Sequence, residues 1–160
     1  MSERRWIRGV LVVLTLVSLA GCIGPWPGVS VSTTLYLGEP EITGEQGTLT
    51  IWVAGMPDGG VAAIHVEIDG LLYDPEKLSA LTVEGCSGFV VTNSQFADGE
   101  GGFLMVNLSG VEAGPVAKLT FTAHGNVNDG DVQLLADRIT LVSDAYTFIT
   151  DWKTPAYYAR

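Results

Sequence analysis

The chain has 160 residues, and its 8 basic and 18 acidic side chains give a formal net charge of −10 at pH 7. An acidic surface of this kind repels phosphate backbones, which argues against nucleic acid as a partner. A chain of this length suits one domain with a hydrophobic core of its own.

The first 21 residues have the layout of a secretory signal peptide. Three arginines within the first eight residues precede an apolar run from Val10 to Leu19, and small residues follow the run. The run is too short to span a bilayer stably. The string Leu19-Ala20-Gly21-Cys22 resembles the lipobox of bacterial lipoproteins, in which the preceding peptide is removed and the cysteine is acylated. We therefore expect a signal-peptide helix over residues 1–21 and a lipid anchor on Cys22.

Two alternatives stay open for this segment: an ordinary secretory signal, or an uncleaved membrane helix in which Cys22 is incidental. Lipidation would place the protein outside the cytoplasm, held to the cell membrane by acyl chains, at the cell surface or on the periplasmic face. Residues 22–28 contain two prolines and are expected to form a short, stiff linker that keeps the folded part close to the bilayer. Loss of residues 1–21 would remove three basic side chains and one acidic one, leaving a net charge of −12.

Residues 29–150 have the pattern of β-strands, because apolar side chains recur with period two in short segments separated by Gly, Asp and Pro. In one segment Ile64, Val66 and Ile68 are expected on the core face, opposite His65, Glu67 and Asp69. The other expected strands are Val29–Leu37, Leu49–Val53, Leu81–Val83, Phe89–Thr92, Phe103–Leu108, Lys118–Ala123, Val132–Ala136, Ile139–Val142 and Ala145–Ile149. The pattern predicts an all-β protein, an antiparallel β-sandwich whose two sheets bury their apolar faces against each other. Residues 151–160 lose the pattern and are predicted to be a C-terminal tail.

No pattern in the chain indicates catalysis, a cofactor or a metal site. Asn126–Asp131 resembles a calcium loop but lacks side-chain oxygens at required positions, so that a turn is the better interpretation. His65 and His124 are accompanied by no nucleophile elbow or zinc motif. Acylation of the first cysteine would leave Cys86 without a disulfide partner, as a partly buried residue in a turn. Asn107–Ser109 matches the glycosylation sequon, and we interpret the match as incidental.

One segment departs from the strand pattern and carries a family resemblance. In Tyr73–Leu78, Asp74 suits the N-cap of a single helical turn and Pro75 its first position. Together with two earlier strings, this segment resembles the progression G-x-P…G-I-A…YDP-x-x-L of cohesin domains. The strings are Gly55-Met56-Pro57, Gly60-Val61-Ala62 and Tyr73-Asp74-Pro75-Glu76-Lys77-Leu78, and later resemblances lie in Gly110–Ala123 and Val132–Leu141.

The resemblance covers most of residues 29–149 and implies a jelly-roll sandwich of about nine strands. It also implies a binding module and not an enzyme, one that holds a dockerin module through one sheet face. Ala63 and His65 fall where the familiar cohesins carry polar and acidic residues that contact dockerin, so recognition of the familiar kind is in question.

Two sets of outward-facing residues are candidates for contact with a partner. His65, Glu67 and Asp69 alternate along one strand, about 7 Å apart by strand geometry, and could hold the basic residues of a partner. The alternative is the solvated face that any antiparallel sheet presents. Trp52 alternates with core residues and could stack on a sugar ring or anchor a protein; the alternative is that a loop or the C-terminal tail covers it.

Three functions follow from these features. The first is a membrane-anchored, cohesin-like module that holds a protein partner, such as a dockerin-bearing protein, at the cell surface. The second is a carbohydrate-binding module that recognises polysaccharide, and the third is a structural envelope lipoprotein whose sandwich packs against a neighbouring protein.

Overall fold

The computed structural model describes residues 33–55 and 60–154, all of which belong to one compact unit, Val31–Arg160. The predicted signal peptide, Cys22 and the linker lie outside the described residues, and so do Met56 and Pro57 of the first cohesin-like string. Within the described part of the chain, no helix is long and apolar enough to cross a membrane.

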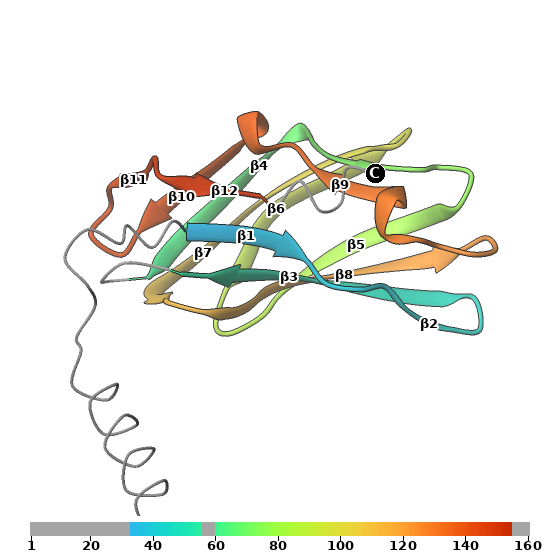
Figure 1. Cartoon of the computed structure of the whole chain (residues 1–160), viewed down its shortest axis with the longest axis horizontal. Helices are drawn as coiled ribbons and strands as arrows, with labels where there is room; N and C mark the ends of the chain where they lie inside the picture. The colour runs from blue at the N-terminus through green and yellow to red at the C-terminus, as the bar shows by residue number, and fades with distance from the viewer. Residues whose placement is uncertain (1–32, 56–59, 155–160) are drawn as a thin grey trace, which may run out of the picture. The chain divides into compact units, whose positions relative to one another are not determined.

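The described residues form two six-stranded sheets, which Figure 1 shows as two stacked layers. Sheet A has the order β12-β1-β3-β8-β5, with β2 paired to β3. Its strands are β1 (Thr33–Leu37), β2 (Glu41–Thr43), β3 (Gln46–Ala54), β5 (Leu78–Gly85), β8 (Gly114–Ala123) and β12 (Trp152–Lys153). Its strand pairs are antiparallel except for β1 and β12, which run parallel.

Sheet B has the order β11-β10-β4-β7-β6, with β9 paired to β4, and all of its pairs are antiparallel. Its strands are β4 (Val61–Tyr73), β6 (Val90–Ala97), β7 (Glu100–Val111), β9 (Val132–Leu134), β10 (Ile139–Ser143) and β11 (Phe148–Ile149). Two 3₁₀ turns, Asp129–Asp131 and Ala136–Arg138, flank β9. The predicted all-β sandwich is confirmed, and four of its twelve described strands are only two or three residues long.

The core lies between the sheets and follows the period-two pattern of the sequence. On β3, Leu49, Ile51 and Val53 are each at most 2% exposed, while the residues between them are partly exposed. Phe121 on β8 is the largest fully buried side chain, at 2% exposure. Alternation places one face of each strand against the opposite sheet, so burial of these side chains drives the two sheets together.

The alternation expected along β4 breaks after Val66. Ile68, which was predicted on the core face, is 51% exposed, so this prediction is wrong. The pairing of β4 with β7 shifts register between Val66 and Leu71, as a β-bulge does, and the shift reverses which residues face the core. Glu67 and Asp69 of the candidate site lie within this bulge.

The paired strands extend beyond residue 150, where the sequence predicts that the sandwich ends. Trp152 and Lys153 form β12, whose register partners are Thr33 and Thr34 on β1. The indole of Trp152 is partly buried against the core. The strand pattern is invisible here because two residues are too few to show a period.

The two turns singled out in the sequence are held by their own side chains. Asp74 Oδ1 accepts a hydrogen bond of 2.9 Å from the main-chain N–H of Glu76, as expected for a cap. Asp131 Oδ2 accepts one of 2.7 Å from the N–H of Asn128, and its Oδ1 lies 2.7 Å from Lys77 Nζ. Burial alone would raise the pKa of Asp131, but the hydrogen bonds from Lys77 and Asn128 outweigh it and lower that pKa below its ordinary value. These carboxylates therefore hold turns, as predicted for residues 126–131.

Candidate functional site

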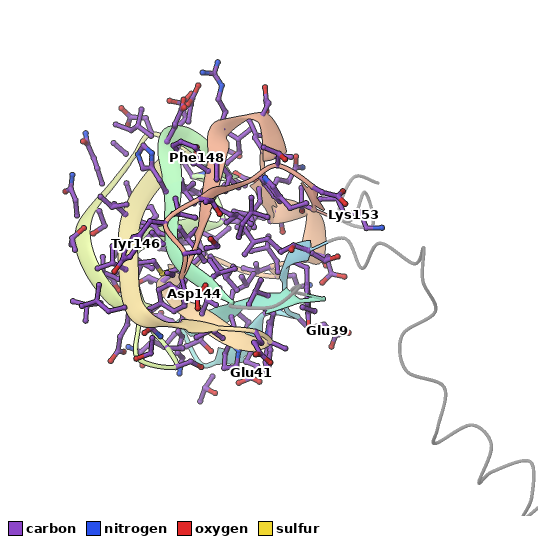
Figure 2. All side chains as sticks on the ribbon, turned by 90° about the vertical axis from the view of Figure 1, so that its left-hand side faces the viewer. Glu39, Glu41, Asp144, Tyr146, Phe148 and Lys153 are labelled. Atoms are coloured by element: carbon purple, nitrogen blue, oxygen red, sulfur yellow. The ribbon has the colours of Figure 1, made fainter. Side chains whose placement is uncertain are left out.

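A row of apolar side chains crosses the outer face of sheet B from one edge to the other. Its members are register partners on five neighbouring strands: Phe148 on β11, Val142 on β10, Ala63 on β4, Val106 on β7 and Val90 on β6. Phe148 is 74% exposed and Val90 63%, while the three members between them are partly exposed. We call this set the apolar row; Figure 2 views the sandwich from the end where β10 and β11 meet and labels Phe148.

Most of the large exposed hydrophobic side chains lie on this same face. Of the seven such side chains among the described residues, Phe148 and Val90 belong to the apolar row, and Leu108, Leu104 and Ile68 extend it over β7 and β4. Leu108 is 81% exposed, the highest value of the seven. Single exposed hydrophobic residues are ordinary, but a contiguous set makes this face a candidate contact surface.

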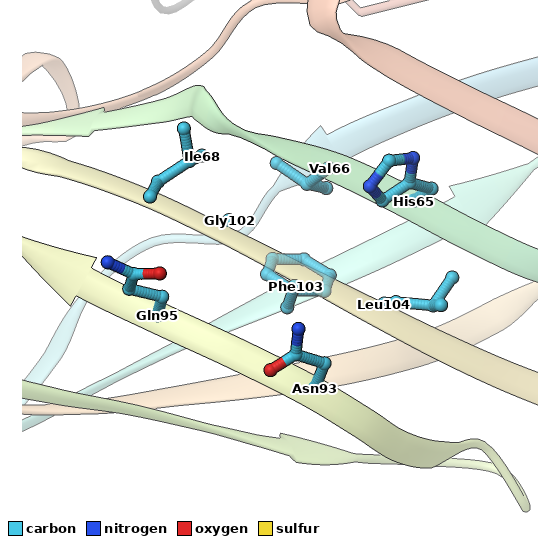
Figure 3. A pocket seen from close by; sticks show the side chains of 8 residues that line it. All are labelled: His65, Val66, Ile68, Asn93, Gln95, Gly102, Phe103 and Leu104. Carbon is cyan, nitrogen blue, oxygen red and sulfur yellow. The ribbon is translucent and has the colours of Figure 1, made fainter.

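A shallow hollow lies beside the apolar row. His65 and Ile68 on β4 and Asn93 and Gln95 on β6 project around it, and β7 runs between them (Figure 3). Gln95 is the register partner of Gly102 on β7, which adds no side chain to the walls of the hollow. The hollow is open and has both polar and apolar walls, so it could accept one side chain of a partner.

The predicted trio His65, Glu67 and Asp69 is divided in the structure between an ion-paired pair and the hollow. Arg138, from the second 3₁₀ turn, places Nη1 3.2 Å from Glu67 Oε2 and Nε 3.4 Å from Asp69 Oδ2. The hydrogen bond to Glu67 and the charge of Asp69 raise the pKa of Arg138. A cation of the chain itself therefore lies beside these two carboxylates, whereas His65 lines the hollow.

Trp52 faces outward as expected, but from sheet A, the opposite layer of the sandwich. It pairs with Tyr36 on β1, and the two ring centroids are 6.4 Å apart with planes inclined by 12°. Tyr36 was not predicted as a neighbour of Trp52. Its alternation with Leu35 and Leu37 indicates an outward position, but only the register of β1 against β3 shows that the two rings are neighbours.

The remaining polar residues considered in the sequence have structural roles. Asn107 is 7% exposed; its Nδ2 donates a hydrogen bond of 2.8 Å to the carbonyl of Ser87, and its Oδ1 accepts one of 2.9 Å from Ser109 N. The sequon therefore has a buried and engaged amide. Cys86 is partly buried, and burial, followed by the charge of Glu84, raises the pKa of its thiol. Residues 33–55 and 60–154 bring together no group of three or more His, Cys, Asp or Glu side chains that could hold a metal ion.

No protein-family model matches the sequence, and a search of the curated proteins finds no match either. Among solved structures, the cohesin module of a family 33 glycoside hydrolase from Clostridium perfringens is similar over 76% of this chain and 92% of that module, with a TM-score of 0.53 and 13% identity. The chain has a cohesin-like fold. A non-cellulosomal cohesin from the hyperthermophilic archaeon Archaeoglobus fulgidus is also similar, over 77% of this chain and 86% of that one, with a TM-score of 0.48 and 13% identity.

Two residues of the cohesin-like strings, Gly60 and Asp74, shape the course of the main chain. Gly60 has φ +70°, and a Cβ there would lie 2.7 Å from the main-chain nitrogen of Val111, so a side chain at this position would be strained and obstructed. Asp74 caps the turn that leads into β5.

Gly102 is expected to control the geometry of the bulge and the hollow. A Cβ at Gly102 would lie 2.5 Å from the carbonyl oxygen of Glu67 and 2.7 Å from Cα of Ile68, both main-chain atoms of β4. Gly102→Ala should therefore lower the free energy of unfolding by about 1–3 kcal/mol, as forced overpacking does. Urea denaturation measures the change. The matched control is Gly130→Ala, because a Cβ at Gly130 meets nothing within 4 Å; equal stability of the two variants would contradict this account of the bulge.

Proposed function

We propose that this protein is a lipid-anchored, extracytoplasmic module that binds a protein partner through the outer face of sheet B. The observation that carries the proposal is the apolar row with its flanking leucines, which is continuous across five strands and exposed at both ends. Burial of apolar area of this kind supplies most of the free energy of protein association. The cohesin-like fold supports a dockerin-bearing protein as the first partner to test.

The surroundings of the apolar row suit a partner with an apolar centre and a basic rim. An exposed acidic residue lies near its border, because Asp144 follows β10 and precedes the β11 strand that carries Phe148. The chain as a whole carries a charge of −10, so lysines and arginines at the edge of the partner would speed association and set its orientation. A predominantly acidic partner would be repelled.

Anchoring through Cys22 would keep the bound partner at the membrane. The described residues form a sandwich, and a short linker would hold whatever the sandwich captures close to the bilayer. A structural envelope role would use the same face with one constant partner, and crosslinking in intact cells distinguishes the two by whether that partner is constant or exchangeable.

Leu108→Asp is expected to weaken partner binding by at least about tenfold, because it places a charge among the apolar side chains that the partner would cover. Leu108 is 81% exposed in the free protein, so the change should leave folding intact. The measurement is calorimetric titration of the purified protein with purified dockerin modules encoded by the same organism. Ile42→Asp is the matched control, since the side chain of Ile42 is 40% exposed and lies on sheet A.

Two results would contradict the proposal. One is binding of the Leu108→Asp protein with unchanged affinity, which would exclude the outer face of sheet B as the binding surface. The other is an equal loss in the Ile42→Asp protein, which would show that the effect is one of general surface charge. Absence of binding by every dockerin module tested would reject the dockerin partner.

A further inference from the structure

The outer face of sheet A differs in chemistry from that of sheet B. Instead of aliphatic side chains, it carries rows of hydroxyl groups on neighbouring strands. Thr48 on β3 pairs with Thr120 on β8, which pairs with Thr82 on β5. In the next row Thr122 on β8 pairs with Ser79 on β5. This face therefore presents donors and acceptors of hydrogen bonds over a broad, slightly twisted surface.

These threonine hydroxyl groups are available to a ligand. Thr82 is exposed, and Thr48, Thr120 and Thr122 are partly exposed. Within residues 33–55 and 60–154 their hydroxyls make no hydrogen bond. The serine of the second row is engaged, because Ser79 Oγ lies 2.6 Å from His124 Nε2.

Two aromatic rings lie on the same face, four residues along β3 from Thr48, and the row of Thr50, Lys118 and Glu84 lies between them and the hydroxyl rows. The centroids of Tyr36 and Trp52 are 6.4 Å apart in nearly parallel planes. Contact between stacked rings occurs at about 3.5–4 Å, so most of this separation is a sideways displacement, and neither ring fully covers the other. A Cβ at Gly38 would lie 3.2 Å from Trp52 Nε1, so the absence of a side chain at Gly38 leaves space for the indole to lean across β1.

We propose that the outer face of sheet A binds a neutral polysaccharide, with Trp52 and Tyr36 stacking on sugar rings and the threonine hydroxyls bonding to sugar hydroxyls. Aromatic faces attract the C–H-bearing faces of pyranose rings, and hydroxyl groups can both donate to and accept from the alcohols of a sugar.

The charges on this face favour a neutral chain over an anionic one. Lys118 on β8 and Glu84 on β5 are register partners of opposite sign. The overall charge of −10 would repel uronic acid or sulfated polymers.

This surface and the apolar row lie on opposite sides of the sandwich, since Trp52 faces outward from sheet A and Val106 from sheet B. A protein partner and a polysaccharide could therefore be bound at the same time. The polysaccharide site is independent of the proposed function: either could exist without the other.

The test is depletion of the full chain from solution by insoluble polysaccharides. The protein is held in a detergent without a sugar headgroup and mixed with microcrystalline cellulose, chitin, insoluble xylan and insoluble β-glucan. At least one polymer should deplete the protein, and Trp52→Ala should raise the dissociation constant for it by about tenfold or more. Tyr36→Ala should act in the same direction, and Thr48→Ala and Thr120→Ala, which change surface hydroxyls only, should weaken binding by smaller factors.

Phe148→Ala is the matched control, because it removes an exposed aromatic ring from the opposite face. Circular dichroism and thermal unfolding confirm that each variant is folded; if Trp52→Ala is not, Tyr36→Ala and the threonine variants decide. Depletion by none of the four polymers, or depletion that the Tyr36, Thr48 and Thr120 variants leave unchanged, would overturn the proposal. The Leu108→Asp protein should retain polysaccharide binding, so a failure of the protein-binding proposal is distinguishable from a failure of this one.

Discussion

Replacing Cys22 by alanine is expected to abolish acylation of the protein completely. The thiol is the proposed site of lipid attachment, and the lipobox-like string at residues 19–22 loses its final residue in the variant. Each buried methylene of an acyl chain contributes about 0.8 kcal/mol to membrane binding, so loss of the lipid removes the proposed anchor. Cells fed an alkyne-bearing fatty acid should label the wild-type protein strongly and the variant not at all. Intact mass should show that the wild-type chain begins at Cys22, and that the variant is not processed there.

Cys86→Ala provides the control for this experiment, because it removes the only other cysteine of the chain. Its thiol is partly buried and its pKa is raised, which makes it a poor nucleophile. The Cys86→Ala protein should be labelled like the wild type. Label that persists in the Cys22→Ala protein would contradict the anchor, and an unlabelled wild-type chain with an intact residue 1–21 segment would favour the uncleaved helix.

Phe121→Ala is expected to lower the free energy of unfolding by about 3–5 kcal/mol, the cost of deleting a large side chain from a packed core. Phe121 is 2% exposed and pairs with Gly47, whose missing side chain leaves room for its ring. For a domain of this size such a loss corresponds to a fall in Tm of about 10–20 °C. Calorimetry or thermal unfolding followed by circular dichroism measures the change.

Phe148→Ala deletes the same atoms at a position that is 74% exposed, and it separates stability from binding. Its free energy of unfolding should change by no more than about 0.5 kcal/mol, as for other surface substitutions. Its affinity for the protein partner should fall nevertheless, because Phe148 ends the apolar row. A large loss of stability in the Phe148→Ala protein would show that the ring is part of the core and would remove it from the binding face.

The sequence predicted the sandwich because a half-buried strand has an apolar residue at every second position. Leu49, Ile51 and Val53 are buried as their alternation indicates. Ile68 is the exception, since the register shift that exposes it depends on how β4 meets Gly102 on another strand. A local pattern carries no information about a contact of that kind.

The same local patterns predicted only some of the residues at the candidate sites. Glu67 and Asp69 were correctly placed at the surface, but Arg138, which forms ion pairs with both, is about 70 residues away in the chain and reaches them only through the pairing of β10 with β4. Trp52 was identified without Tyr36, its neighbour on β1.

The sequence by itself determined the all-β class, the turn at Asp74 and the segment that resembles a lipobox, because strand alternation, capping and cleavage signals depend on neighbours in the chain. Only the tertiary structure decided what each face of the sandwich presents. Ala63, Val90, Val106, Val142 and Phe148 come from five separate strands, and strand order and register alone bring them into one row. The physical reason is that a sheet face is assembled by hydrogen bonding between distant segments, so its chemistry is set by pairing and not by local sequence.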